Sequence, residues 1–193
     1  QEFNPLHPLR ISALGPKTEN ATAFLDAVAE AEADIRSLAA HNVDLVSINQ
    51  LEMYVPSGVD LASLREARSI IGNLPAYWEA PAERAEETIA LLAEHNSNAD
   101  APTFGYKLRT GGVTADAFPT SLQIAKALGI PATHEVPLKF TAGLHNPLRH
   151  LRDDVNTKMH GFINVLSAAV LSAGQKWTKT TTVSMLADAH QQN

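Results

Sequence analysis

The segment FGYKLRTGG, residues 104–112, indicates which fold the chain adopts. Its aromatic and aliphatic residues alternate with Lys107 and Arg109, which is the period of a buried β-strand. The glycines that follow allow a tight turn with exposed backbone N–H groups. Two cations on one strand face, next to a glycine turn, are typical of an anion-binding site. We therefore predict a strand whose carboxyl end carries function.

Strand and helix patterns alternate along the rest of the chain. Further strands are expected over residues 9–14, 43–48, 74–79 and 136–141. Helices are expected over residues 20–40, 60–71, 81–95 and 120–128, and Asp60 and Thr120 can cap two of them.

Three stretches are less clear. Residues 49–58 either continue the second strand or form a long loop. Residues 159–173 form either one helix, or a short strand over 160–165 and then a helix from about Ser167. Residues 175–193 are expected to form a polar tail.

This alternation predicts an α/β fold with a parallel sheet. Right-handed crossovers place the carboxyl ends of all strands on one rim. No GxGxxG motif follows the first strand and no P-loop is present, which argues against dinucleotide and nucleoside triphosphate folds. We expect one TIM-barrel-like (β/α) domain over residues 1–193, complete or partial, with five or six βα units. Because a full barrel has eight units, we expect that amino-terminal strands are missing.

The composition argues against several functional classes. With 193 residues, of which 45% are hydrophobic and 19% charged, the chain is long enough for one globular core. A net charge of −6 without a concentrated basic face argues against nucleic-acid binding. The absence of cysteine excludes disulfides and thiolate metal sites, and no apolar stretch is long enough to span a membrane. We expect a cytoplasmic protein that does not bind membranes.

The candidate catalytic residues lie at or just after the ends of expected strands. Burial and a neighbouring ammonium both favour a neutral amine, which can attack a carbonyl carbon and form a Schiff base. A carboxylate or an imidazole can then move protons. Each candidate also has a structural interpretation. The lysines can form ion pairs with Glu79 or Glu52. Glu79 can be a carboxylate that stabilises a helix amino terminus, and the histidine can lie in an exposed loop. The candidates are Lys107, Lys139, Glu79 and His145.

The candidate anion-binding residues directly follow the first lysine. A guanidinium fork beside backbone N–H donors suits a phosphate or a carboxylate. The alternative is that Arg109 pairs with Asp116 and that the glycines only form a turn. The anion-binding set is Arg109, Thr110, Gly111 and Gly112.

No cofactor is expected and no metal ligand is assigned. His145 and His150 are five residues apart, which is not the spacing of a helical metal-binding pair, and no HExxH motif is present. A divalent metal is kept as an alternative.

The two lysine segments resemble class I, Schiff-base aldolases of the deoxyribose-phosphate aldolase type. Lys107-Leu-Arg-Thr-Gly-Gly is similar to the strand with the Schiff-base lysine in that family, and Lys139-Phe-Thr-Ala-Gly is similar to the next strand, which carries a second lysine and a small-residue turn. Arg109 and His145 depart from the family pattern.

Three longer segments resemble an uncharacterised group of bacterial barrel-like proteins more closely. They are KLRTGGVTADAFP (107–119), KFTAGLHNPLRH (139–150) and MHGFINV (159–165). In that resemblance the present chain lacks the amino-terminal strands, and no activity carries over.

We therefore expect an aldolase-type lyase that acts on a small anionic carbonyl compound through an imine on Lys107 or Lys139. The alternatives are a metal-assisted lyase or isomerase, and a non-catalytic binding or assembly subunit derived from a barrel. Because an incomplete barrel leaves a sheet edge open, we expect a homo-oligomer or a partner that covers this edge.

Overall fold

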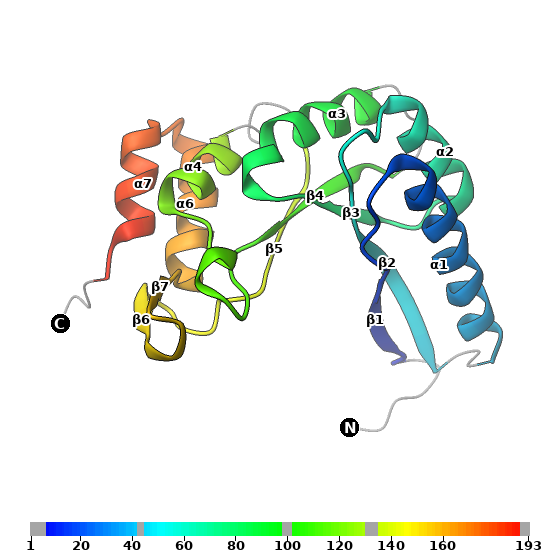
Figure 1. Cartoon of the computed structure of the whole chain (residues 1–193), viewed down its shortest axis with the longest axis horizontal. Coiled ribbons are helices and arrows are strands. Elements are labelled where there is room, and N and C mark those ends of the chain that lie inside the picture. Colours follow the sequence, from blue (N-terminus) through cyan, green and yellow to red (C-terminus); the bar gives the residue numbers. More distant parts are fainter. Residues whose placement is uncertain (1–6, 42–44, 98–101, 130–134, 190–193) are drawn as a thin grey trace. The chain divides into compact units, whose positions relative to one another are not determined.

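A computed structural model describes residues 7–41, 45–97, 102–129 and 135–189 (Figure 1). Five strands form one parallel sheet in the order β1-β2-β3-β4-β5. This confirms the α/β class and the parallel sheet, while a TIM barrel stays a prediction. The strands are β1 (Leu9–Leu14), β2 (Val46–Tyr54), β3 (Ala76–Glu79), β4 (Phe104–Arg109) and β5 (Leu138–Thr141).

A helix follows each of the first four strands. The described residues contain no helix that combines the length and the apolar character needed to cross a membrane. The connecting helices are α1 (Ala21–His41), α2 (Leu61–Ile71), α3 (Ala85–Ser97, after a 3₁₀ turn at Ala82–Arg84) and α4 (Ser121–Gly129).

The chain divides into two compact units, which are described separately. The first contains Gln1–Ala80 and Leu91–Tyr106, and the second contains Pro81–Ala90 and Lys107–Asn193. The expectation of one barrel-like domain over residues 1–193 stays a prediction.

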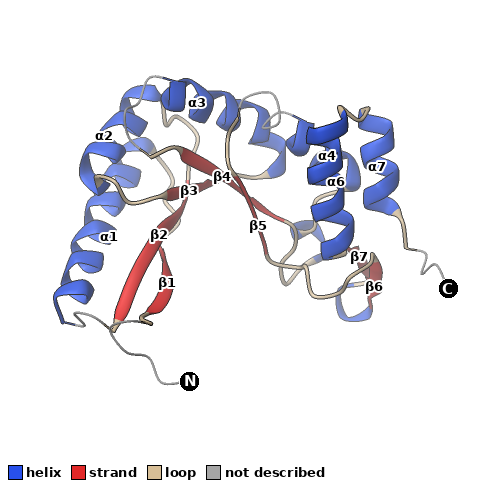
Figure 2. Cartoon of the chain, turned by 180° about the vertical axis from the view of Figure 1, so that it is seen from behind, coloured by secondary structure: helices blue, strands red, loops and turns tan. Residues whose placement is uncertain are grey.

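Aromatic side chains form the centre of the first unit, where α1 and α2 lie on the same side of β1–β3 (Figure 2). Trp78 makes edge contacts with Phe24 and with Phe104, and the ring centroids are 5.1 Å apart in both pairs. All three rings are fully buried.

Arg68 is a buried cation beside these rings. Its guanidinium lies 4.0 Å from the centroid of the Phe104 ring, and burial lowers the pKa of Arg68 to about 10. The Arg68 guanidinium donates to the carbonyls of Gly72, Leu74 and Pro102.

The expected strands and helices of this unit are present, while the expected start of the second strand at residue 43 lies outside the described residues. The first strand has the expected limits, and the Asp60 side chain caps α2 by accepting the N–H of Ser63 at 2.8 Å. The second strand runs from Val46 to Tyr54, so residues 49–54 continue it. The alternative that residues 49–58 form a long loop is therefore wrong.

The carboxyl-terminal part of the second unit differs most from expectation. After β5, a hairpin forms from β6 (His150–Arg152) and β7 (Thr157–Met159), followed by α6 (Phe162–Gln175) and α7 (Lys179–Ala187). The sequence suggested neither the hairpin nor α7. One helix starts at Phe162, so the strand alternative for residues 160–165 is wrong.

The segment expected to be a polar tail contains α7. This helix packs against α4 and α6, and it buries Thr182 and Leu186. The apolar stripe contains few large residues among threonines and serines, which explains why the periodicity of the sequence did not reveal a helix.

Candidate functional site

The ends of β4 and β5 lie side by side in the second unit. The Thr110 N–H donates to the carbonyl of Thr141 at 2.8 Å. In a parallel strand pair, the residue that donates its N–H lies opposite the residue that follows the acceptor in the chain. For example, Leu9 donates to the carbonyl of Leu45 and lies opposite Val46. Thr110 therefore aligns with Ala142. Counting back along regular strands from this bond, we infer that Lys107 lies opposite Lys139 and on the same face of the sheet.

The turns after the two lysine strands are in backbone contact. A Cβ atom on Gly111 would lie 2.6 Å from the Phe118 ring and 2.9 Å from the Cα of Gly143. Gly143 has a positive φ of 74°, which disfavours any other residue. Only glycine at both positions lets the turns approach this closely. The two glycine segments that the sequence singled out therefore meet in space.

Thr110 connects these turns. Its side chain is fully buried, its N–H donates to the carbonyl of Thr141, and its hydroxyl donates to the carbonyl of Ala142. Both donors are used inside the protein, so this residue holds the two strand ends together.

The other expected anion-binding groups have different environments. Arg109 is exposed at the end of β4, Gly111 is buried, and Gly112 is half-buried. The carbonyl of Gly112 accepts a hydrogen bond from Nη1 of Arg152 at 3.1 Å. Arg109 is therefore the member of this set whose side chain is accessible to an anion from solvent.

The candidate catalytic residues also differ in exposure. The Lys107 side chain is 8% exposed and Lys139 is half-buried, and both interact with other groups in the protein. His145 is exposed in the loop after β5, as the alternative interpretation expected. Glu79 belongs to the first unit, where it is the last residue of β3 and aligns with Tyr54.

A buried polar network in the second unit was missed by the sequence analysis. Asn164 is 1% exposed, accepts the backbone N–H of Arg149 at 2.9 Å, and donates at 3.0 Å to each of two carbonyls of the α7 end, those of Met185 and Asp188. The Arg149 guanidinium donates to the hydroxyl of Ser121, and burial lowers its pKa. The sequence signal for this network was Asn164, a polar residue inside the apolar pattern of residues 162–170.

His160 is a second buried polar group of this unit. Its side chain is fully buried, and its Nε2 donates to the carbonyl of Pro119 at 2.6 Å. Burial is the largest cause that lowers the pKa of His160, the Pro119 carbonyl opposes it, and the charge of Arg149 adds to the lowering. The lowered pKa favours the neutral ring, and the hydrogen bond to the Pro119 carbonyl favours a proton on Nε2.

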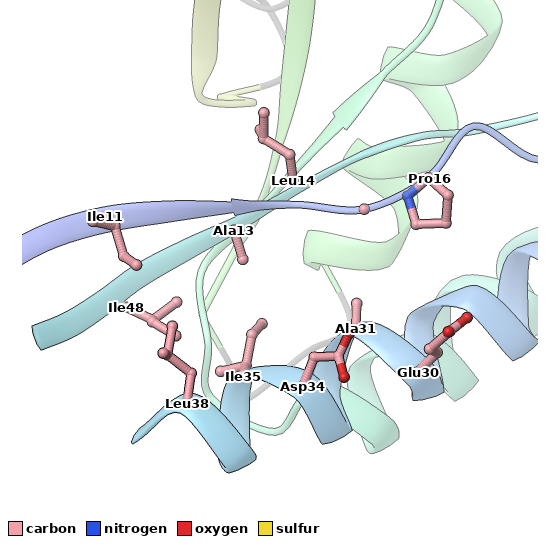
Figure 3. Close-up of a pocket in the computed structure, with 11 residues that line it drawn as sticks. Ile11, Ala13, Leu14, Pro16, Glu30, Ala31, Asp34, Ile35, Leu38 and Ile48 are labelled. Carbon is pink, nitrogen blue, oxygen red and sulfur yellow. The ribbon is translucent and has the colours of Figure 1, made fainter. Parts of the chain in front are cut away.

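The first unit contains an apolar cavity of about 380 Å³ between β1 and α1 (Figure 3). Ile11 and Ala13 of β1 face Ile35 and Leu38 of α1, with carboxylates of the same helix nearby. The β1 strand is the first in the sheet order, so this cavity lies at a sheet edge. A second copy or a partner covering this edge stays a prediction.

Comparison with known proteins gives no family for the chain: no protein-family model, curated protein or solved structure matches it. The resemblances to class I aldolases and to the bacterial barrel-like group therefore stay predictions. Among the residues that the structure describes, no group of three or more His, Asp or Glu side chains is placed to hold a metal ion.

Proposed function

We propose that the protein is an aldolase-type lyase that binds a small anionic carbonyl compound and forms an imine on Lys107 or Lys139. The observation that carries this proposal is the hydrogen bond from the Thr110 N–H to the Thr141 carbonyl, which brings the ends of the two lysine strands side by side.

The environments of the two lysines suit this chemistry. Lys107 is shielded from water, whereas half-buried Lys139 is accessible to a small molecule. In the reaction the amine nitrogen attacks the carbonyl carbon, a C=N bond forms, and the carbonyl oxygen leaves as water. Because both side chains already interact within the protein, the substrate competes with those partners.

Two exposed residues complete the proposed site in this unit. Arg109 follows Lys107 by two positions on β4, and its guanidinium can bind a carboxylate or phosphate with two hydrogen bonds. His145 follows β5 and can exchange protons with a substrate and with solvent. Glu79 belongs to the first unit and has no part in this proposal.

Borohydride trapping tests the imine. The protein is incubated with a panel of aldehydes and keto acids, reduced, and analysed by intact mass and peptide mapping. We expect one covalent adduct per chain on Lys107 or Lys139, and loss of that adduct when the modified lysine is replaced, as in Lys107→Met or Lys139→Met. Lys158→Met removes an exposed lysine of β7 and is the matched control.

Two results of the trapping experiment would contradict the proposal. Absence of an adduct with every compound, or adducts spread over exposed lysines such as Lys158, removes the imine mechanism. Because Lys107 is buried, far-UV circular dichroism of each variant must first show that it is folded.

A further inference from the structure

A separate cavity of about 780 Å³ lies in the second unit. Residues of α4, α6, α7 and the start of α3 line it, and none of the proposed imine-site residues does. Its volume is in the range of sites that bind cofactors and other small molecules. The charged and aromatic side chains that line it belong to Lys126, Lys176, Lys179, Trp177 and Glu86.

Positive charge is concentrated around this cavity, although the chain carries a net charge of −6. Three lysines and one glutamate line it. Within the described part of the chain, no carboxylate forms an ion pair with Lys126, Lys176 or Lys179. These three lysines and Glu86 are exposed, so the cavity wall carries more cations than carboxylates, which favours an anionic ligand.

The start of α7 adds to this positive field. The Thr178 side chain caps the helix by accepting the N–H of Thr181, and the first helical residue is Lys179. The first turn contains no acidic residue. A helix amino terminus carries partial positive charge, so the exposed Lys179 there is slightly unfavourable, and a bound anion would offset this cost. A lysine in place of an acidic residue at a helix start goes against the usual preference, and such departures are typical of functional sites.

Trp177 supplies a planar apolar surface beside these charges. Its ring is half-buried, and its Nε1 donates to Oε1 of Gln175 at 2.9 Å. This hydrogen bond restrains the ring, and its face can stack on an aromatic ligand. The same cavity therefore offers an aromatic wall and a cationic wall.

We propose that this cavity binds a phosphorylated aromatic small molecule of the nucleoside monophosphate kind. The planar ring stacks on Trp177, and the phosphate binds Lys126, Lys176, Lys179 and the amino terminus of α7. Glu86, on the wall formed by the start of α3, accepts a hydrogen bond from a hydroxyl or amino group of the ligand.

Titration of the full chain with AMP, phenyl phosphate, adenosine and inorganic phosphate tests this proposal. Isothermal calorimetry gives the affinities. We expect AMP and phenyl phosphate to bind with a Kd below about 1 mM, and AMP to bind at least about tenfold more tightly than adenosine or inorganic phosphate. Tryptophan fluorescence reports on the ring contact, because the other tryptophan, Trp78, is fully buried in the first unit.

Variants separate the contributions. The double variant K176Q/K179Q should weaken AMP binding by about tenfold or more. The control K158Q, which replaces an exposed lysine of β7, should leave AMP binding unchanged. Trp177→Phe should keep binding in calorimetry and abolish the fluorescence change. Imine trapping should be unaffected in K176Q/K179Q, so this test is independent of the proposed lyase activity.

The proposal is overturned if neither AMP nor phenyl phosphate binds below about 1 mM. It is also overturned if adenosine or inorganic phosphate binds as tightly as AMP, since the ring and the anion would then not be recognised together. An unchanged affinity in K176Q/K179Q would show that the lysines of the cavity do not hold the phosphate.

Discussion

Both units bury apolar and polar side chains, but different interactions connect the segments at their centres. The first packs Phe24, Trp78 and Phe104 edge to face. The second buries His160 and Asn164 and connects segments far apart in sequence through their hydrogen bonds. Apolar packing tolerates substitutions that keep the side-chain volume, whereas a buried polar group needs each of its partners. The two units should therefore respond differently to substitution.

The largest effect is expected from Trp78→Ala in the first unit. The change removes the ring that contacts both other aromatic side chains and leaves a cavity, so we expect a loss of about 3–5 kcal/mol in the free energy of unfolding. Urea denaturation followed by circular dichroism measures it. Trp177→Ala is the matched control, because this half-buried ring of the second unit should cost less than about 1 kcal/mol. Equal losses in both variants would contradict the aromatic centre.

A smaller loss is expected from Asn164→Ala in the second unit. The change leaves the carbonyls of Met185 and Asp188 and the N–H of Arg149 without their partner, which should cost about 1–3 kcal/mol. Urea denaturation again gives the value, with the exposed Asn146→Ala as control.

Asn164→Leu then separates hydrogen bonding from volume. It restores most of the side-chain volume without any of the hydrogen bonds. If Asn164→Leu is as stable as the unchanged protein, the difference between the two units is not one of polar contacts.

The smallest effect, counted per pH unit, is expected in the pH dependence of stability. Burial lowers the pKa of His160 in the folded state, so below the ordinary histidine pKa the unfolded state binds more protons. Stability is therefore fully present above that pKa and decreases as the pH falls from about 7 to about 5, by at most about 1.4 kcal/mol per pH unit for one group. Denaturation curves across this pH range measure the slope.

Two variants assign this slope to the two units. His160→Gln keeps a donor for the Pro119 carbonyl and should flatten the decrease. Burial also lowers the pKa of His95 in the first unit, where the ring stacks on Phe104, so His95→Gln should flatten it independently. A slope unchanged by His160→Gln would show that this ring does not titrate with unfolding.

Much of the first unit could be predicted from sequence because its signals are local. The alternation over residues 9–14 marks β1, and the capping preference of Asp60 marks the start of α2. In the second unit the hairpin of β6 and β7 and the helix α7 were missed. Their strands are three residues long, and α7 lacks a wide apolar stripe, so no local pattern separates them from loop.

The sequence by itself determined the alternation of strands and helices, the parallel sheet and the two glycine turns that follow lysine strands. These depend on side-chain period and backbone freedom, which act over a few residues. Only the tertiary structure decided that the Thr110 N–H bonds the Thr141 carbonyl, that Gly111 meets Gly143, and that Lys126, Lys176 and Lys179 line one cavity. Register and packing bring together residues far apart in the chain, and no local pattern encodes such distances.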